Sequence, residues 1–228
     1  HPQNAYRNGT MYSSYTAAQI ARTYELADLH GVNLLGSVTW AFEFEDQPYF
    51  DGFRDLATNG IDKPVLNVFR MLRQMGGERV AAESSSASPI QTIPDAGAQG
   101  APDVNALASR QNQAVSVLVW NYHDDDLPAP PAKVELVVEG LPVEANERLS
   151  LHHYRVDAEH SNSYEVWKKM GSPQKPSPEQ YLQLERAGQL QLLGSPEWLR
   201  AAGGRVTLKF DLPRQGVSLL KLTWVGAK

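Results

Sequence analysis

The stretch GSVTWAFEFEDQPYF, residues 36–50, restricts the possible folds of this chain more than any other part of it. Alternate positions carry large apolar side chains, at Val38, Trp40, Phe42 and Phe44. The positions between them are mostly small, at Ser37, Thr39 and Ala41, followed by Glu43 and Glu45. A strand whose two faces are both largely apolar or small is typical of a parallel sheet covered on both sides. The sequence therefore predicts a buried strand here.

The end of this predicted strand has the composition of a carbohydrate site. The acidic residues Glu45 and Asp46 are followed closely by the aromatic residues Tyr49 and Phe50. Carboxylates accept hydrogen bonds from hydroxyl groups, and aromatic rings stack on the apolar C–H faces of a pyranose. The alternative is an ordinary strand end that leads into a solvated loop, because acidic residues alone are common in such loops.

Two predicted helices flank the strand. The first covers residues 16–30, after a polar and turn-rich start in residues 1–14. Thr16 and Gln19 have the spacing of a capping box, and Gly31 is a good terminator. Its apolar stripe consists of Ala17, Ile20, Tyr24, Ala27 and His30. The second helix begins at Pro64 and ends at Gly76-Gly77. Helix, strand and helix in succession indicate a (β/α) architecture that needs further elements to bury its strand.

The pattern changes after Gly77. Residues 83–102 are rich in Ser, Pro, Ala and Gly, which predicts a loop or linker. Beyond them, hydrophobicity alternates with period two in residues 113–122, 133–138, 148–157, 205–212 and 217–225. Such runs, separated by turn residues, predict an antiparallel β-sandwich. Two helical insertions are expected near residues 163–170 and 177–187, the second capped by Ser177 with Pro178 at its first position.

Composition excludes several classes of protein. The 228 residues suffice for one or two domains with a real core. A net charge of −5 without a basic run argues against a nucleic-acid partner. No apolar stretch approaches the roughly 18 residues needed to span a membrane. The absence of cysteine rules out disulfides and thiolate metal sites.

Other candidate chemistry is weak, and we expect no metal and no cofactor. His152 and His153 are adjacent on a predicted strand, so their side chains face opposite sides. The turn at residues 123–126 offers oxygen ligands, although a solvated acidic turn is the simpler interpretation. Glu43 and Glu45 share a strand face, but the carboxylate pairs of glycosidases usually come from different strands, so neither is assigned a catalytic role. Four aromatic residues are predicted to pack the helical insertions against the sandwich: Tyr164, Trp167, Tyr181 and Trp198.

Several segments together resemble glycoside hydrolase family 39, and within it the bacterial β-xylosidases. Phe44-Glu45-Asp46-Gln47 resembles the F-E-E-Q at the end of the last barrel strand in that family. Lys63-Pro64 with Phe69 resembles the helix that follows. The resemblance continues through LVWNYHDDD (118–126), HYRVD with HSNSY (153–164), W-x-x-MG-S-P-Q (167–174) and LLKLTW (219–224). It covers nearly the whole chain.

The resemblance implies an α/β plus all-β chain, because family members carry a (β/α)8 barrel, a β-sandwich and small helical excursions. Residues 1–77 would be the C-terminal segment of the catalytic barrel, and residues 78–228 the β-sandwich domain. Family members cleave with retention, using two Glu residues. Both are expected upstream of His1, so no catalytic residue is expected in this chain, and the chain alone is expected to be inactive.

The resemblance also implies the substrate and its contacts. Glu45 matches a substrate-binding Glu, Asp46 replaces the second Glu, and Phe44 lies beside them. Trp40 lies near the family's stacking Trp. The implied activity is release of xylose from the non-reducing end of β-1,4-xylooligosaccharides. The partners would be such an oligosaccharide, or another small glycoside, and the N-terminal part of the barrel. A bacterial cytoplasm or periplasm is expected rather than a membrane.

Two alternatives stay open. The first is a non-catalytic carbohydrate-binding or structural sandwich that retains a barrel remnant, although such a module has no use for the apolar run at residues 36–44. The second is an α-L-iduronidase-like member of the same family, which requires basic groups for the uronate carboxylate, and these are expected in the N-terminal part of the barrel.

Overall fold

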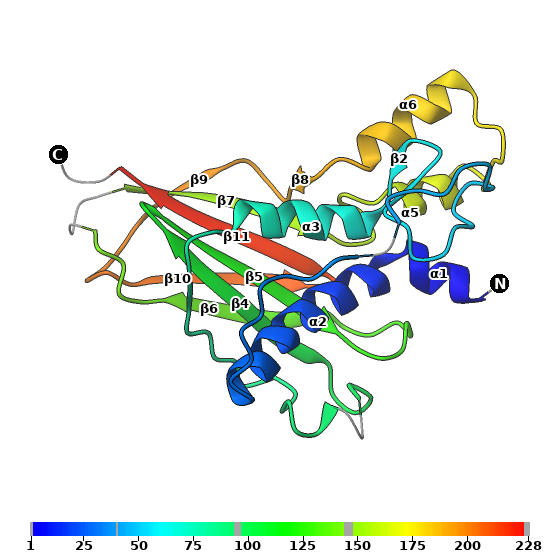
Figure 1. Cartoon of the computed structure of the whole chain (residues 1–228). Coiled ribbons are helices and arrows are strands. Elements are labelled where there is room, and N and C mark those ends of the chain that lie inside the picture. Colours follow the sequence, from blue (N-terminus) through cyan, green and yellow to red (C-terminus); the bar gives the residue numbers. More distant parts are fainter. Residues whose placement is uncertain (1, 40, 94–96, 144–147, 226–228) are drawn as a thin grey trace.

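The computed structural model describes residues 2–39, 41–93, 97–143 and 148–225, which form three layers (Figure 1). The middle layer is a seven-stranded sheet with the order β3-β4-β5-β11-β7-β8, in which β9 also pairs with β7. Its strands are β3 (Glu78–Val80), β4 (Asp103–Gln111), β5 (Ala114–Tyr122), β7 (Arg148–Val156), β8 (Gln191–Leu192), β9 (Glu197–Arg200) and β11 (Val217–Trp224). All its pairings are antiparallel. This confirms the predicted antiparallel pattern.

Alternation along the central strands divides the apolar core in two. On β5, Val115, Val117 and Val119 face a two-stranded sheet of β6 (Ala132–Val138) and β10 (Val206–Leu212). Leu118 and Trp120 face the helices on the other side of the sheet. The run of apolar residues from Val117 to Trp120 is thus explained by burial on both faces of the strand.

The helical layer begins earlier than predicted. Helix α1 covers Pro2–Asn8 and α2 covers Thr10–Leu29, so residues 2–14 are largely helical rather than the predicted turn-rich start. Thr16 lies inside α2, where its hydroxyl donates to the carbonyl oxygen of Tyr12 (2.7 Å), and it is therefore not a cap. Gly31 does adopt a left-handed conformation after the helix, at φ +63°. Its role as terminator is confirmed.

The buried face of α2 is made mainly of small residues and contains only part of the predicted stripe, Ala17 and Ala27. Ala17, Ala18 and Ala21 pack in the apolar core against the sheet, and Ser13 and Ser14 are also buried. His30 is exposed and Tyr24 is 39% exposed. Small side chains let the helix approach the sheet closely, and Ser14 uses the proximity to donate to the Gln215 side chain (2.6 Å). Beside α2 lies α3 (Pro64–Gln74), which buries Val68 and Met71 and confirms the predicted start at Pro64.

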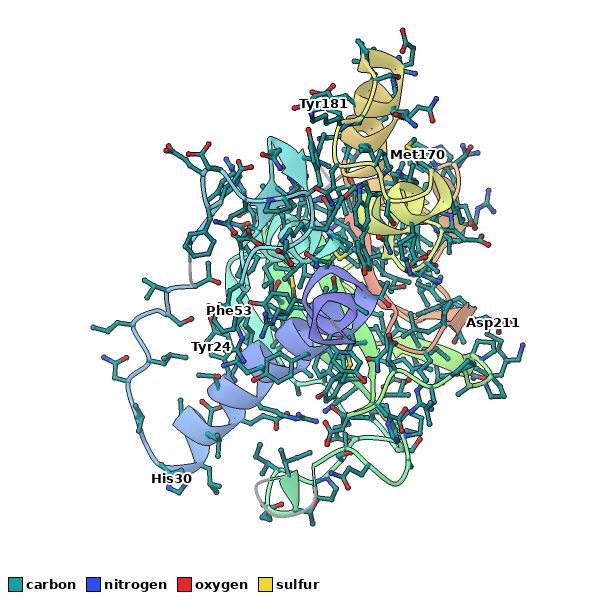
Figure 2. All side chains as sticks on the ribbon, turned by 90° about the vertical axis from the view of Figure 1, so that its right-hand side faces the viewer. Tyr24, His30, Phe53, Met170, Tyr181 and Asp211 are labelled. Carbon is teal, nitrogen blue, oxygen red and sulfur yellow. The ribbon has the colours of Figure 1, made fainter. Side chains whose placement is uncertain are left out.

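The predicted buried strand at residues 36–44 is wrong for this chain. Its described residues form no strand, and Val38 and Phe42 are 97% and 58% exposed. A strand is stable only when it pairs with at least one neighbouring strand, and the described residues place no strand beside this one. After α2 the segment follows an extended path that stands away from the helix (Figure 2).

Most of the elements predicted after residue 77 are confirmed. The five alternating runs correspond to β5, β6, β7, β10 and β11. The helical insertions are α5 (Ser163–Lys169) and α6 (Pro178–Ala187). Ser177 and Gln180 form a complete capping box at the start of α6. The sequence did not reveal β4, because its alternating apolar positions include small alanines that give a weak signal.

Candidate functional site

The predicted site residues lie on one long loop, between the extended segment and α3. The loop closes on itself, because the carbonyl oxygen of Phe42 accepts from the backbone N–H groups of Leu56 (2.8 Å) and Ala57 (2.9 Å). It then forms a short hairpin of β1 (Ala57–Thr58) and β2 (Ile61–Asp62). The hairpin turn is Asn59-Gly60, and both of its residues have positive φ, as a tight hairpin turn requires.

The loop forms an open hollow of about 550 Å³, which we call the acidic hollow. It is lined by Phe42, Glu43, Phe44, Glu45 and Asp46, and by Asn59 and Gly60 of the hairpin turn. Glu43 is fixed within it, since its carboxylate accepts the Gly60 backbone N–H at 2.9 Å. Glu45 and Asp46 are exposed, and Phe44 is half-buried. The hollow thus presents three carboxylates beside two aromatic rings.

The structure brings together three of the four predicted substrate contacts, Phe44, Glu45 and Asp46. The fourth, Trp40, lies outside the described residues. Asp46 adopts φ +56°, a left-handed conformation that Asp tolerates better than most residues. Within the described part of the chain, no ion pair joins Glu45 to Arg54, whose guanidinium lies 5.5 Å from the Phe53 ring centre. The Glu45 carboxylate is therefore not held by that arginine.

Sequence reasoning missed the hairpin that forms the back of the acidic hollow. Asn59-Gly60 is a strong local signal for a two-residue hairpin, so the sequence does contain this information. The association of Glu43 with Gly60 carries no such signal, because it joins residues 17 positions apart through a backbone N–H. Glu43 consequently did not stand out as a residue of the substrate site.

A buried ion pair fixes the base of the loop. The Lys63 ammonium donates to the Asp55 carboxylate, and the two side chains are 0% and 2% exposed. Burial lowers the pKa of Lys63, and the hydrogen bond with Asp55 opposes this shift. Gly52 packs so closely that a Cβ there would lie 1.9 Å from an Asp55 carboxylate oxygen. The conformation of the loop thus depends on the buried Asp55 carboxylate, which contacts both Lys63 and Gly52.

The two helical insertions pack on this loop rather than on the sandwich, which corrects the prediction for their aromatic residues. The Phe50 ring lies 5.3 Å from the Tyr164 ring and 4.9 Å from the Trp167 ring. Tyr181 belongs to the same apolar cluster. Trp198 takes no part, because it lies on β9 and is 67% exposed. Figure 2 looks at this end of the molecule, with Tyr181 on α6, Met170 after α5 and Phe53 on the loop.

The residues considered for metal binding have other partners. His153 Nε2 lies 3.0 Å from Ser218 Oγ, and burial lowers the pKa of His153 to about 4. In the acidic turn at residues 123–126, Asp125 pairs with Arg214, and Asp124 accepts from the Tyr122 hydroxyl (2.6 Å). Across the described ranges, no group of three or more His, Cys, Asp or Glu side chains is arranged to hold a metal ion. None of the described helices is long and apolar enough to cross a membrane.

Carboxylates that accept hydrogen bonds from hydroxyl groups, and aromatic rings that stack on apolar faces, are features shared by many sugar-binding sites. Residues 1–197 match the model of Glycosyl hydrolases family 39, and the chain belongs to that family. It is 26% identical over 183 residues to a β-xylosidase of Caldicellulosiruptor saccharolyticus. That match covers 77% of this chain and 34% of the relative, so the chain spans about a third of the curated relative's length.

Solved structures show the same fold over almost the whole chain. A GH39 enzyme from Xanthomonas axonopodis pv. citri superimposes with a TM-score of 0.73 at 20% identity, covering 96% of this chain and 42% of that one. A monomeric β-xylosidase from Caulobacter crescentus gives 0.73 at 16% identity, with coverages of 99% and 44%. A bacterial orthologue of human α-L-iduronidase gives 0.66 at 18% identity, with coverages of 96% and 39%.

Proposed function

We propose that this chain is the C-terminal portion of a retaining glycoside hydrolase that releases xylose from the non-reducing end of β-1,4-xylooligosaccharides. In this proposal residues 1–77 complete a (β/α)8 barrel and residues 78–228 form its accessory sandwich. The acidic hollow supplies contacts to the sugar. The two carboxylates that retaining cleavage requires, about 5–5.5 Å apart, come from the preceding part of the barrel.

The observation that carries the proposal is the acidic hollow itself. It holds Glu43, Glu45 and Asp46 beside Phe42 and Phe44, in a chain whose curated relative is a β-xylosidase. Carboxylates accept hydrogen bonds from sugar hydroxyls, and charged acceptors make the stronger hydrogen bonds. Its open shape suits the end of an oligosaccharide that enters from solvent.

The exposed apolar segment supports the barrel part of the proposal. Leu35 and Val38 are almost fully exposed, and Phe42 is 58% exposed. Contiguous exposed apolar side chains mark a surface that another part of a protein covers. A free-standing sandwich gains nothing from such a segment, whereas a barrel buries it between two neighbouring strands.

An α-L-iduronidase-like activity is the second candidate. It is favoured by the likeness to the bacterial iduronidase orthologue and by two arginines near the loop. The guanidinium groups of Arg7 and Arg54 lie 4.5 Å and 5.5 Å from the Phe53 ring centre. A uronate carboxylate needs such donors. Hydrolysis of aryl β-xyloside and aryl α-L-iduronide by the complete enzyme distinguishes the two activities.

The experiment that tests the proposed function is Glu45→Gln in the complete enzyme. A charged acceptor on a sugar hydroxyl contributes about 1.5–3 kcal/mol, so kcat/KM for an aryl β-xyloside should fall roughly ten- to a hundredfold. The melting temperature should not change, because Glu45 is exposed. Azide should not restore activity, because such rescue marks the acid/base or the nucleophile.

Glu197→Gln is the matched control, since this residue is an exposed glutamate on β9. It should leave kcat/KM within about twofold, because an isolated surface substitution changes little. If kcat/KM is unchanged in Glu45→Gln, Glu45 does not contact the substrate.

A further inference from the structure

The helices cover only one end of the seven-stranded sheet. At that end, Val217 and Leu219 of β11 and Val156 of β7 pack in the apolar cluster that they share with α2 and α3. Toward the other end, the same face of the sheet carries polar and charged side chains. Figure 1 shows β9 and these ends of β7 and β11 extending past α3.

The strand register identifies the side chains at this second end. Leu149 of β7 pairs with Leu199 of β9, and both pack in the core of the sandwich. Because side chains alternate along a strand, the residues on either side of each leucine face the opposite way. The same alternation applies to Leu151 on β7 and to Leu222 on β11. The surface opposite these leucines, which we call the basic face, consists of Arg148, Ser150, His152, Trp198, Arg200 and Lys221.

The cations of the basic face are not neutralised. Arg148 and Arg200 are exposed and directly opposite each other, and like charges in such a pair destabilise a sheet. Among the residues that the structure describes, no carboxylate forms an ion pair with either arginine or with Lys221. In the two-stranded sheet, by contrast, Lys133 and Lys209 pair with carboxylates at 2.6 Å and 2.9 Å. The basic face therefore attracts anions, although the net charge of the chain is −5.

Trp198 adds a flat apolar surface beside these cations. Its side chain is 67% exposed, whereas tryptophan is on average largely buried. The backbone beneath it is fixed, because Leu199 packs against the core and Trp198 itself pairs with Ser150. The Ser150 hydroxyl lies 3.5 Å from Nδ1 of His152, so two further polar groups accompany the ring. An exposed ring among such groups suits a pyranose, which offers C–H faces and hydroxyl groups together.

This combination of groups selects one class of ligand. The guanidinium fork of arginine binds a carboxylate through two parallel N–H···O bonds, and the indole ring packs on a sugar ring. A polysaccharide that carries carboxylates offers both partners in one molecule. A nucleic acid demands a longer run of Lys and Arg than the three cations of the basic face. Membership of a glycosidase family also favours a sugar polymer.

We propose that the basic face binds a polysaccharide that carries carboxylate groups. Trp198 packs against a sugar ring, and Arg148 and Arg200 hold a carboxylate. The basic face is separate from the acidic hollow, because β9 and β2 lie at opposite ends of the molecule (Figure 1). The inference goes beyond the proposed function, since it does not depend on which glycoside the acidic hollow contacts.

The test measures binding of two matched polymers to the complete enzyme by calorimetry. One is xylan that bears glucuronate groups, and the other is the same xylan after its carboxylates have been reduced to alcohols. The charged polymer should bind about tenfold more tightly. In Arg148→Gln/Arg200→Gln this preference should fall to about twofold or less, because no paired guanidinium groups remain. Trp198→Ala should weaken binding of both polymers about three- to tenfold, since the ring contact does not need the carboxylate.

Lys133→Gln/Lys209→Gln is the matched control, because it changes the net charge equally but on the other sheet. This control should keep the preference for the charged polymer. Equal binding of the two polymers by the unsubstituted enzyme, or equal losses in the two double variants, would overturn the proposal. Melting temperatures identify a Trp198→Ala protein that fails to fold, and the double variant of the exposed arginines then provides the result.

Other occupants of the basic face give different results. A dimer in sedimentation that Trp198→Ala dissociates would assign the face to a second copy of the chain. Inorganic polyphosphate that binds as tightly as the charged xylan, with no effect of Trp198→Ala, would identify a surface for any anion. Either result would overturn the proposal.

Failure of the proposed function can be told apart from failure of this inference. Both double variants and Trp198→Ala lie outside the acidic hollow, so each should hydrolyse an aryl β-xyloside within about twofold of the unsubstituted enzyme. An enzyme that binds the charged xylan as expected but hydrolyses no xyloside would contradict the proposed function and support the basic face.

Discussion

The Lys63 ammonium and the Asp55 carboxylate form an ion pair that is almost completely buried at the base of the loop carrying the acidic hollow. Lys63 is also the residue immediately before α3. The pair therefore joins the loop to the start of a helix that packs on the sheet. Through it, the position of the residues that line the acidic hollow depends on the core.

Lys63→Met should destabilise the protein strongly. The substitution keeps the length of the side chain but leaves the Asp55 carboxylate buried without its partner, a change that costs about 3–5 kcal/mol. Urea denaturation measures the free energy of unfolding. Lys133→Met is the control, because it breaks a pair with Asp211 whose side chains are 79% and 53% exposed. That pair should contribute less than about 1 kcal/mol, and equal effects of the two substitutions would contradict the prediction.

Gly52→Ala should disturb the same loop from the other side. The added methyl group would lie 1.9 Å from an Asp55 carboxylate oxygen, so the loop or the ion pair must shift. Overpacking of this kind costs about 1–3 kcal/mol. Gly194→Ala is a suitable control, since no other atom lies within 4 Å of a Cβ built there. The prediction is wrong if the two variants unfold at the same urea concentration.

Stability should fall between pH 6.5 and pH 4 because of His153. Burial lowers the pKa of His153 from 6.5 to about 4. In this pH range the unfolded chain binds a proton that the folded chain does not, so acid favours unfolding. Between pH 7.5 and pH 5 the loss should be about 2 kcal/mol.

The measurement for His153 is the free energy of unfolding at these two pH values. His153→Gln should remove most of the difference between them, because the variant has no imidazole to protonate. The pKa of Asp157 is lowered from its ordinary value of 3.8, so this carboxyl group is ionised in both the folded and the unfolded chain at pH 5. It therefore does not contribute to the pH dependence between pH 7.5 and pH 5. A variant with the same pH dependence as the unsubstituted protein would exclude His153 as the cause.

The purified 228-residue chain should not hydrolyse an aryl β-xyloside. In the proposed function both catalytic carboxylates lie in the preceding part of the barrel, and retaining cleavage needs both. The measurement is release of the aryl group by material shown by mass spectrometry to contain no longer polypeptide. Turnover by such material would place catalytic residues within this chain.

The sequence by itself determined the elements whose signals are local. Pro64 begins α3, Ser177 caps α6, and the period-two runs became strands. These outcomes depend on the backbone chemistry of a few neighbouring residues. The acidic and aromatic composition of residues 42–46 can also be read directly from the sequence.

The tertiary structure alone decided what those elements contact. Thr16 has the spacing of a capping residue, yet it lies within α2, whose buried face of small residues packs on the sheet. Gln174 holds Tyr49 across 125 positions of sequence, and no local pattern encodes that distance. The apolar run near Val38 has the pattern of a buried strand but is exposed in this structure. Burial is a property of a residue's partners, and a strand without neighbours cannot bury its side chains however apolar they are.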